Sequence, residues 1–292
     1  MSTYSIRDLE QLSGIKAHTL RIWEQRYAIL SPDRTDTNIR TYGDDDLKRV
    51  LNISLLKDHG YKISEIAKLS SDELNREVVK ISERQLNYPD QIHALTISML
   101  DLSEERFEKI ISANIAQSGF ENTMVNIIYP FLSRIGTLWV TGSIGPAQEH
   151  FITNLIRQKI IVAIDGLRGT PDKPGKTYML FLPEGEFHEI SLLFAHYIIR
   201  SRSNKVIYLG QNLPLNELVF AHQIHQPDYI FTVLTSVPAN HEVQPFVNRM
   251  AKAFPNSQIL LTGYQVVGQD IETPGNTAII NQINELMRIS SN

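Results

Sequence analysis

The chain has 292 residues, and its composition is ordinary for a soluble globular protein, with 42% hydrophobic and 21% charged residues. Its formal net charge of −4 excludes a generally basic coat, so any nucleic-acid binding must come from a local arrangement of cations. The absence of cysteine excludes disulfides, thiolate metal sites and cysteine nucleophiles. The length allows two or three domains. The sequence shows neither a run of about 18 apolar residues nor a basic-then-apolar leader, so we expect a cytoplasmic protein.

The first thirty residues have the pattern of two short helices. One helix is predicted between Ser5, which is suited to an N-cap, and Gly14, which is suited to a C-terminal stop. A second helix is predicted from about Lys16 to Tyr27, with Leu20 and Trp23 facing the core. A helix, a glycine-containing turn and a second helix are typical of a helix-turn-helix, although any short helical hairpin has the same periodicity.

Residues 30–42 are polar and rich in turn-forming residues, and they include Arg34 and Arg40. Such a segment suits a two-stranded wing that places cations along phosphates. The segment from residue 16 to residue 40 contains five Lys and Arg residues and three Asp and Glu residues. Because this excess is modest, charge alone does not predict DNA binding.

The order and spacing of these segments resemble a MerR-type winged helix-turn-helix over roughly residues 3–72. The matching segments are Ile6–Leu9, Leu20–Tyr27, Arg34–Thr35, Arg40–Tyr42 and the following helix pair at 44–56 and 63–69. The Trp-Glu-x-Arg-Tyr ending of the second helix is similar to one branch of that family, the cobalamin-dependent light-sensing regulators of the CarH and LitR kind.

The resemblance implies that the second helix enters the major groove of double-stranded operator DNA, while the wing holds the phosphate backbone. Leu20 and Trp23 are expected in the core rather than on DNA. The residues that the resemblance assigns to DNA contact are His18, Thr19, Arg21, Arg26, Tyr27, Arg34, Arg40 and Tyr42.

The middle of the chain, from residue 71 to 165, reads as successive helices with few turn residues inside them. They are predicted at 92–100, 106–117, 123–138 and 147–164, with Ser103 as an N-cap. This number of helices suits a small four-helix bundle. Residues 166–175 are rich in Gly and Pro and read as a linker.

After the linker, strand-like apolar runs alternate with helical segments. Strands are expected at 178–182, 205–209, 229–234, 258–261 and 278–280, and helices at 189–201, 214–225, 241–254 and 281–289. Regular alternation of strand and helix predicts a doubly wound parallel sheet of the Rossmann-like class. The expected protein is therefore multidomain, α and α/β. Its domains are a winged helix-turn-helix at 1–75, a helical bundle at 76–170 and an α/β domain at 171–292.

Glu186 and His188 lie in the loop after the first predicted strand. In an open α/β sheet, ligands collect at this carboxyl edge. A carboxylate that holds one imidazole nitrogen leaves the other nitrogen to bind a metal. A single Glu-x-His pair in a loop is more often a solvated ion pair, so both interpretations stay open on these two residues alone.

The neighbouring segments resemble the cobalamin-binding pattern of Asp-x-His-x-x-Gly, Ser-x-Leu and Gly-Gly. The matching residues are Glu186, His188, Ser191, Thr232, Leu234, Gly263 and Tyr264, with gaps of 40 and 28 residues between the three motifs. The resemblance implies that His188 is the lower axial ligand of cobalt and that the other two motifs line a slot for the displaced nucleotide tail. Four positions depart from the pattern, and Tyr264 in place of glycine matters most, because a phenol could partly fill that slot.

Trp139 is followed after nine residues by Glu149-His150, which resembles the Trp-x9-Glu-His motif of the light-sensing branch. The resemblance implies that these bundle residues cover the upper face of the corrin ring and its adenosyl group. Taken alone, Trp139 would be read as an ordinary core aromatic residue.

Three functions follow as hypotheses. The first is a transcriptional regulator that binds operator DNA and adenosylcobalamin, in which light breaks the cobalt–carbon bond and changes the assembly. The alternative is a cofactor-independent regulator with a degenerate cobalamin-binding fold, working through a protein partner or RNA polymerase. A corrinoid carrier of an enzyme is disfavoured, because a DNA-binding head has no place in one, so no enzymatic activity is expected. A symmetric head implies a homodimer or tetramer, paired through the long helix after the wing or one at 71–87.

Overall fold

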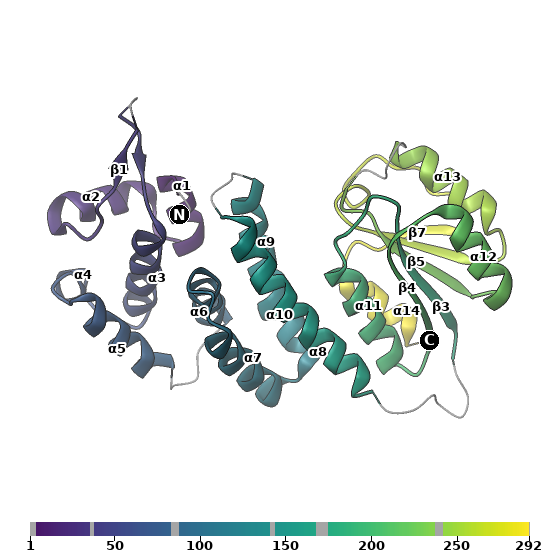
Figure 1. The fold of residues 1–292 in the computed structure, drawn as a ribbon, viewed down its shortest axis with the longest axis horizontal. Coiled ribbons are helices and arrows are strands. Elements are labelled where there is room, and N and C mark those ends of the chain that lie inside the picture. Colours follow the sequence, from purple (N-terminus) through teal and green to yellow (C-terminus); the bar gives the residue numbers. More distant parts are fainter. Residues whose placement is uncertain are drawn as a thin grey trace. The chain divides into compact units, whose positions relative to one another are not determined.

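The structure is a computed structural model that describes residues 4–35, 38–82, 88–140, 144–167, 175–236 and 242–291, without the side chains of residues 72, 75, 79–82 and 137–140 (Figure 1). The chain divides into two compact units, Met1–Leu155 and Ile156–Asn292. Among the described residues, no helix is both long enough and apolar enough to cross a membrane. The division into three domains stays a prediction.

The first unit begins with the predicted helix-turn-helix, formed by α1 (Ile6–Ser13) and α2 (Ala17–Tyr27). The Ser5 side chain accepts from the Asp8 amide, and the Asp8 carboxylate accepts from the Ser5 amide, which completes a capping box. Gly14 ends α1 at φ 75°, a left-handed conformation that glycine adopts without strain. Leu20 is fully buried and Trp23 is 7% exposed, which confirms both as core residues.

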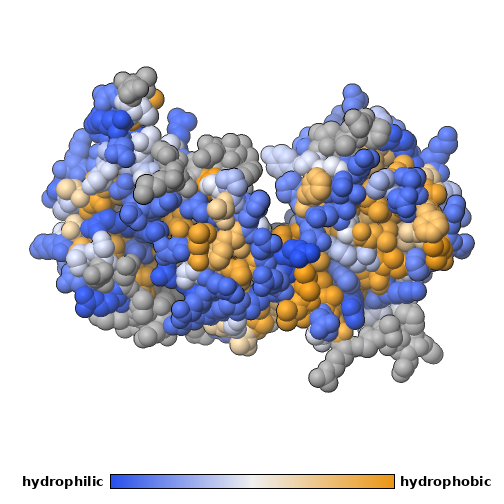
Figure 2. Space-filling view, viewed as in Figure 1, coloured by the Kyte–Doolittle hydropathy of each residue, from blue (hydrophilic) through white to orange (hydrophobic). Residues whose placement is uncertain are grey.

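The predicted wing is present as β1 (Asp33–Arg34) paired antiparallel with β2 (Arg40–Thr41). Three helices follow it: α3 (Asp44–Asp58), α4 (Ile63–Ile66) and α5 (Ser71–Ser82). Helix α4 is shorter than the predicted span of 63–69, because its continuation tightens into bonds from Lys68 N to Glu65 O and from Leu69 N to Ile66 O. Hydrophilic side chains predominate around the wing in the space-filling view (Figure 2).

The bundle consists of α6 (Tyr88–Leu100), α7 (Glu104–Ser118), α8 (Phe120–Thr123), a π-helical turn η1 (Met124–Ile128), α9 (Tyr129–Val140) and α10 (Pro146–Asp165). The helix predicted at 123–138 is therefore interrupted by a wide turn, in which the Tyr129 amide bonds to Met124 O. Pro130 explains the interruption, because it has no amide hydrogen to donate to the carbonyl four residues earlier.

The second unit is built on a parallel sheet with the strand order β4-β3-β5-β6-β7. The strands are β3 (Thr177–Pro183), β4 (Lys205–Leu213), β5 (Tyr229–Val233), β6 (Gln258–Thr262) and β7 (Thr277–Ile279). The helices are α11 (Ile190–Ser201), α12 (Leu215–His225), α13 (Val243–Ala253) and α14 (Ile283–Ser290). Helices α11 and α14 lie together on one face, and α12 and α13 cover the other (Figure 1). This confirms the predicted doubly wound α/β class.

Strand β3 lies between β4 and β5, so the chain leaves it first toward one side of the sheet and later returns to the other. This reversal is the topological switch point, where ligands bind outside the carboxyl ends of the strands. Met179 and Phe181 face the core under α12 and α13, and Leu180 between them is also buried. The uninterrupted apolar run of β3 follows from burial on both faces, and it carries the chain directly into the loop of His188.

Candidate cofactor and DNA-binding sites

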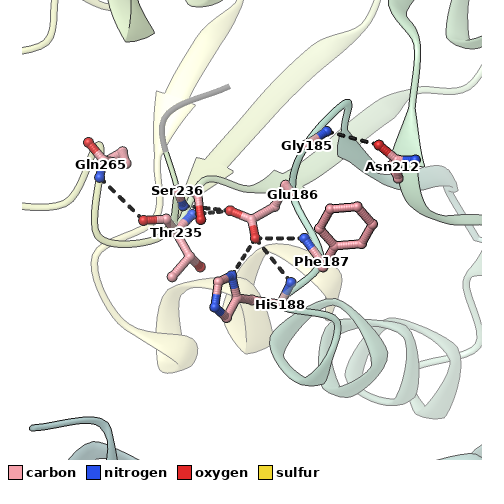
Figure 3. A network of polar contacts seen from close by, with 8 residues as sticks. All are labelled: Gly185, Glu186, Phe187, His188, Asn212, Thr235, Ser236 and Gln265. Carbon is pink, nitrogen blue, oxygen red and sulfur yellow. Dashed lines mark hydrogen bonds and ion pairs between the residues drawn. The ribbon is translucent and has the colours of Figure 1, made fainter. Parts of the chain in front are cut away.

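The loop between β3 and α11 places Glu186 and His188 side by side at the switch point (Figure 3). Gly185 enters the loop at φ 84°, so the chain turns sharply after the strand. His188 Nδ1 lies 2.5 Å from Glu186 Oε1, which also accepts from the amides of Phe187 at 2.9 Å and His188 at 3.0 Å. The carboxylate thus fixes both the backbone of the loop and the orientation of the imidazole.

The second oxygen of Glu186 joins this loop to the end of β5. Oε2 accepts from the amides of Thr235 at 2.8 Å and Ser236 at 2.6 Å (Figure 3). Glu186 is 1% exposed. Burial alone would raise the pKa of this carboxyl, but the hydrogen bonds from the His188 ring and from the Ser236 and His188 amides outweigh it and lower the pKa to about 2. The carboxylate therefore stays ionised and ties two strand ends together across the switch point.

The His188 ring itself projects outward, with 63% of its side chain exposed. Because Nδ1 faces the carboxylate, Nε2 is the nitrogen in position to coordinate a metal. Among the described residues, no group of three His, Asp or Glu side chains could hold an ion. A single imidazole supplies one ligand, which suits a metal that carries its other ligands within a cofactor.

Asn212 braces the same loop from β4, a role that was not predicted from the sequence. The strand was predicted to end at 209, but it continues to Leu213 through a bulge in which Gly210 and Asn212 have φ values of 78° and 57°. The side-chain oxygen Oδ1 of Asn212 accepts from the backbone amide of Gly185 at 2.9 Å, and the backbone amide of Asn212 donates to Glu186 O at 3.2 Å. Glycine and asparagine close together were the available signal, since both tolerate positive φ.

Glu189, the residue after His188, is held by two further side chains. Its carboxylate accepts from Arg157 Nε on α10 at 2.7 Å and from the Tyr208 hydroxyl on β4 at 3.0 Å. The hydrogen bond from Arg157 to Glu189 raises the pKa of the guanidinium, while burial, together with the negative charge of Glu189, raises that of the Tyr208 phenol. The start of α11 is therefore fixed directly after the histidine.

The other predicted cofactor residues differ in their exposure. The side chains of Thr232 and Leu234 are fully buried, so the residues that reach the loop are instead Thr235 and Ser236, which follow β5. Tyr264 is 79% exposed, so its ring lies on the surface, and the expectation that it partly fills the slot for the nucleotide tail stays a prediction. Ser191 is partly buried in the first turn of α11.

Gly263 fits the glycine that the cobalamin-binding pattern requires. It has φ 107°, and a Cβ built on it would lie 2.5 Å from Leu234 O. Any side chain at this position would therefore collide with backbone. The requirement arises from the close approach of two loops at the carboxyl edge of the sheet.

The second cofactor motif belongs to the helices of the first unit. The backbone of Trp139 is in α9, and its side chain lies outside the described part of the chain. Glu149 and His150 lie in the first turns of α10, where His150 Nε2 is 3.4 Å from Glu149 Oε2. The His150 side chain is 71% exposed, so it is accessible to a ligand.

The DNA-contact candidates lie mostly on the surface of α2 and the wing. His18, Arg21, Arg26 and Arg34 are exposed, and Thr19 and Tyr27 are partly buried. The Arg26 guanidinium lies 5.3 Å from the centre of the Tyr27 ring. Their charge and exposure suit contact with phosphates.

Tyr42 does not fit the same role, because it is 1% exposed. Its hydroxyl donates to Glu24 Oε2 at 3.1 Å, and Arg40 Nε donates to Glu24 Oε1 at 3.0 Å. Burial, followed by the charge of Glu24, raises the pKa of Tyr42 to about 12. The expectation of a DNA contact from Tyr42 is therefore wrong. Glu24, whose role was not predicted from the sequence, fastens the wing to α2.

Two family comparisons match successive parts of the chain. The MerR HTH family of regulatory proteins matches residues 4–73, and the B12 binding domain matches residues 91–163. The chain is 26% identical over 259 residues to the transcriptional repressor CarH of Myxococcus xanthus, covering 87% of this chain and 86% of that protein. It is 25% identical over 230 residues to the repressor CarA of the same organism, covering 78% and 75%.

Among solved structures, the monomethylamine corrinoid protein of Methanosarcina barkeri is similar with a TM-score of 0.53 and 11% identity, covering 66% of this chain and 93% of that chain. This likeness concerns the fold alone. The B12-binding match, which is independent of it, supports a cobalamin cofactor. The chain therefore combines a segment that matches the MerR HTH family with a segment that matches the B12 binding domain, and it is homologous over most of its length to the CarH and CarA transcriptional repressors.

Proposed function

We propose that this regulator binds operator DNA through α2 and the wing and senses adenosylcobalamin, with His188 as the lower ligand of cobalt. The observation that carries the proposal is the pair of Glu186 and His188 at the switch point. The buried carboxylate lies 2.5 Å from Nδ1 and the ring is exposed, so in this proposal Nε2 is the nitrogen that binds cobalt.

The chain's own residues prepare the site before any cofactor arrives. Five hydrogen bonds to Glu186 fix the loop, and Asn212 and Arg157 brace it on either side of the histidine. The imidazole therefore loses little conformational freedom on ligation. Gly263 keeps the neighbouring loop close to the sheet. Bound adenosylcobalamin would supply a cobalt–carbon bond that light can break.

In this proposal the domains are those predicted from the sequence, at 1–75, 76–170 and 171–292. Trp139, Glu149 and His150 cover the upper, adenosyl-bearing face of the corrin. Illumination changes the assembly of a homo-oligomer and thereby its hold on DNA. Pairing through α3 or α5 would place two copies of α2 on a symmetric operator.

The cofactor is tested by incubating the purified protein with adenosylcobalamin in the dark, followed by gel filtration and a visible absorption spectrum. We expect corrin bands to elute with the protein and to weaken in His188→Ala. His225→Ala is the matched control, because His225 is an exposed histidine on α12 of the same unit. Wild-type protein that elutes without corrin would overturn the proposal, as would equal binding by His188→Ala.

The regulatory part is tested with a DNA duplex selected by the protein from a random library. Fluorescence anisotropy then gives DNA affinity, and light scattering gives molar mass, before and after illumination of the cofactor-loaded protein. We expect both to change on illumination. Unchanged mass and affinity in protein that carries the corrin would remove light sensing from the proposal and leave cofactor binding intact.

The alternative, a cofactor-independent regulator with a degenerate site, is motivated by Ser191 and Tyr264 standing where the pattern has glycine. It predicts that Tyr264→Gly creates or sharply strengthens cobalamin binding. Because Tyr264 is 79% exposed, we expect instead that this substitution leaves the affinity of the wild-type protein nearly unchanged. The two functions thus differ in the result of one titration.

A further inference from the structure

The C-terminal end of α1 is bound by side chains from two other helices of the first unit. Ser54 Oγ on α3 donates to Ser13 O at 2.7 Å. Arg134 Nη1 on α9 donates to Leu12 O at 3.3 Å, and the backbone of Leu12 also acts on the pKa of His93 on α6. Helices α6 and α9 belong to the bundle, so the bundle reaches the first helix of the helix-turn-helix directly.

These contacts answer a need that α1 does not meet by itself. The last carbonyls of a helix have no partner within it, and its negative end attracts a cation. The last turn of α1 contains no basic residue. Leu12 and Ser13 are 1% and 4% exposed, so water has little access to donate hydrogen bonds to their carbonyl groups. Arg134 therefore supplies from the bundle the cation that the last turn of α1 lacks.

Arg134 is placed for this contact rather than for a surface ion pair. Its side chain is partly buried, and burial lowers the pKa of the guanidinium. Within the described part of the chain, the guanidinium of Arg134 donates a hydrogen bond to the Leu12 carbonyl. Burial of His93, together with the charge of Arg134, lowers the pKa of that histidine to about 4, although the backbone of Leu12 opposes the shift. Arg134 is thus the one charged side chain of this pair near neutral pH.

The turn from α1 to α2 is open on one side. A cavity of about 430 Å³ lies beside it, lined by Gly14 and Lys16 of the turn and by Trp23, His93 and Arg134 among others. Because side chains do not fill this space, the hydrogen bonds at the end of α1 do much to hold the turn in place. Moving the turn would reorient α2, which begins at Ala17.

We propose that Arg134 is a positioning residue for DNA recognition. From the bundle it holds the end of α1, fixes the turn and so presents α2 in the orientation that binds operator DNA. Helix α9 also carries Trp139, five residues beyond Arg134. If Trp139 covers the cofactor, as in the proposed function, α9 also transmits the state of the cofactor to the helix-turn-helix. This transmission rests on the proposed function, whereas the positioning by Arg134 does not.

The test compares Arg134→Gln and Arg134→Lys with Arg106→Gln, a control that removes an exposed cation from α7 of the same bundle. DNA affinity is measured by anisotropy with the selected duplex at several salt concentrations, and folding by the thermal unfolding midpoint. We expect Arg134→Gln to bind DNA at least tenfold more weakly with its midpoint near that of wild type. Arg134→Lys, which keeps the cation, should recover most of the affinity, and Arg106→Gln should bind like wild type.

The salt dependence separates positioning from direct contact. Loss of one phosphate contact lowers the slope of log K against log salt by about 0.9, whereas a positioning residue leaves the slope unchanged. A reduced slope in Arg134→Gln, unchanged affinity, or an affinity loss that tracks a large fall in the unfolding midpoint would each overturn the proposal.

The link to the cofactor is tested by repeating the DNA titrations with and without adenosylcobalamin in the dark. Wild-type affinity that responds to the cofactor, with a smaller response in Arg134→Gln, would support transmission through α9. An equal response in both would refute it. If the wild type binds no cofactor, the proposed function fails, while the salt titration still decides whether Arg134 positions α2.

Discussion

Replacing Glu186 with glutamine tests whether one buried carboxylate organises the candidate cofactor site. Oε1 accepts three hydrogen bonds and Oε2 accepts two, all from nitrogen donors. The glutamine amide can place oxygen on only one side, so its NH₂ group must face at least two donors. Each buried donor left without an acceptor costs about 1–3 kcal/mol. We therefore expect Glu186→Gln to lower the free energy of unfolding of the α/β unit by roughly 2–6 kcal/mol.

The same substitution should change the dependence of stability on pH. The pKa of Glu186 is lowered from 4.5 to about 2 in the folded protein. Its contribution is therefore complete above pH 4.5 and is lost as the pH falls through the folded value. The glutamine variant lacks this component of acid unfolding.

Urea unfolding followed by circular dichroism measures both effects, with cobalamin binding as a parallel readout. Glu186→Asp keeps the charge and serves as the control, with an intermediate loss of stability. His188→Ala should weaken cofactor binding with little loss of stability, because 63% of its side chain is exposed. A Glu186→Gln protein within about 0.5 kcal/mol of wild type, the range of ordinary surface substitutions, and with full cobalamin affinity would refute the reasoning.

Four further substitutions and one pH effect follow from the structure. Gly263→Ala should destabilise the α/β unit by more than about 2 kcal/mol in urea unfolding, because its Cβ would lie 2.5 Å from a carbonyl oxygen. Gly268→Ala, where φ is positive but the space is open, should destabilise it by about 1 kcal/mol. Equal losses in the two variants would contradict the argument from the close approach at Gly263. Glu24→Gln should weaken DNA binding by anisotropy without changing its salt slope, since it loosens the wing, whereas Arg34→Gln should lower the slope by about 0.9 if Arg34 contacts phosphate. Because the pKa of His93 falls from 6.5 to about 4 on folding, the unfolded chain binds its proton first as the pH drops. The first unit should therefore lose about 2 kcal/mol between pH 7 and 5, a loss that should be absent in His93→Gln.

Local sequence determined the elements and their class. Ser5 caps the start of the first helix, and Gly14 ends it in a left-handed backbone conformation. Both effects depend on neighbouring residues only. The apolar run of β3 and the alternation of strands with helices predicted the parallel sheet, because burial on both faces leaves a continuous apolar pattern. The position of Glu186 and His188 after that strand was also readable, since it requires only the order of elements along the chain.

Residues far apart in the sequence decided what the site contains. Thr235 and Ser236 meet Glu186 because β5 pairs with β3, and the sequence does not state which strands are neighbours. Asn212 reaches the loop only through a bulge that extends β4 beyond its apolar run. Tyr42 was assigned to DNA contact by the resemblance to the winged helix-turn-helix, whereas its burial depends on partners elsewhere in the sequence, such as Glu24.

The contact of Arg134 with Leu12 spans 122 positions of the chain and has no local pattern at all. The sequence by itself thus determined the helices, the strands and the loop that carries the histidine, because capping, periodicity and turn residues act over a few neighbours. Only the tertiary structure decided which amides hold the carboxylate and which bundle residue holds the helix-turn-helix. Those partners are set by the pairing of strands and the packing of helices, which bring distant residues together.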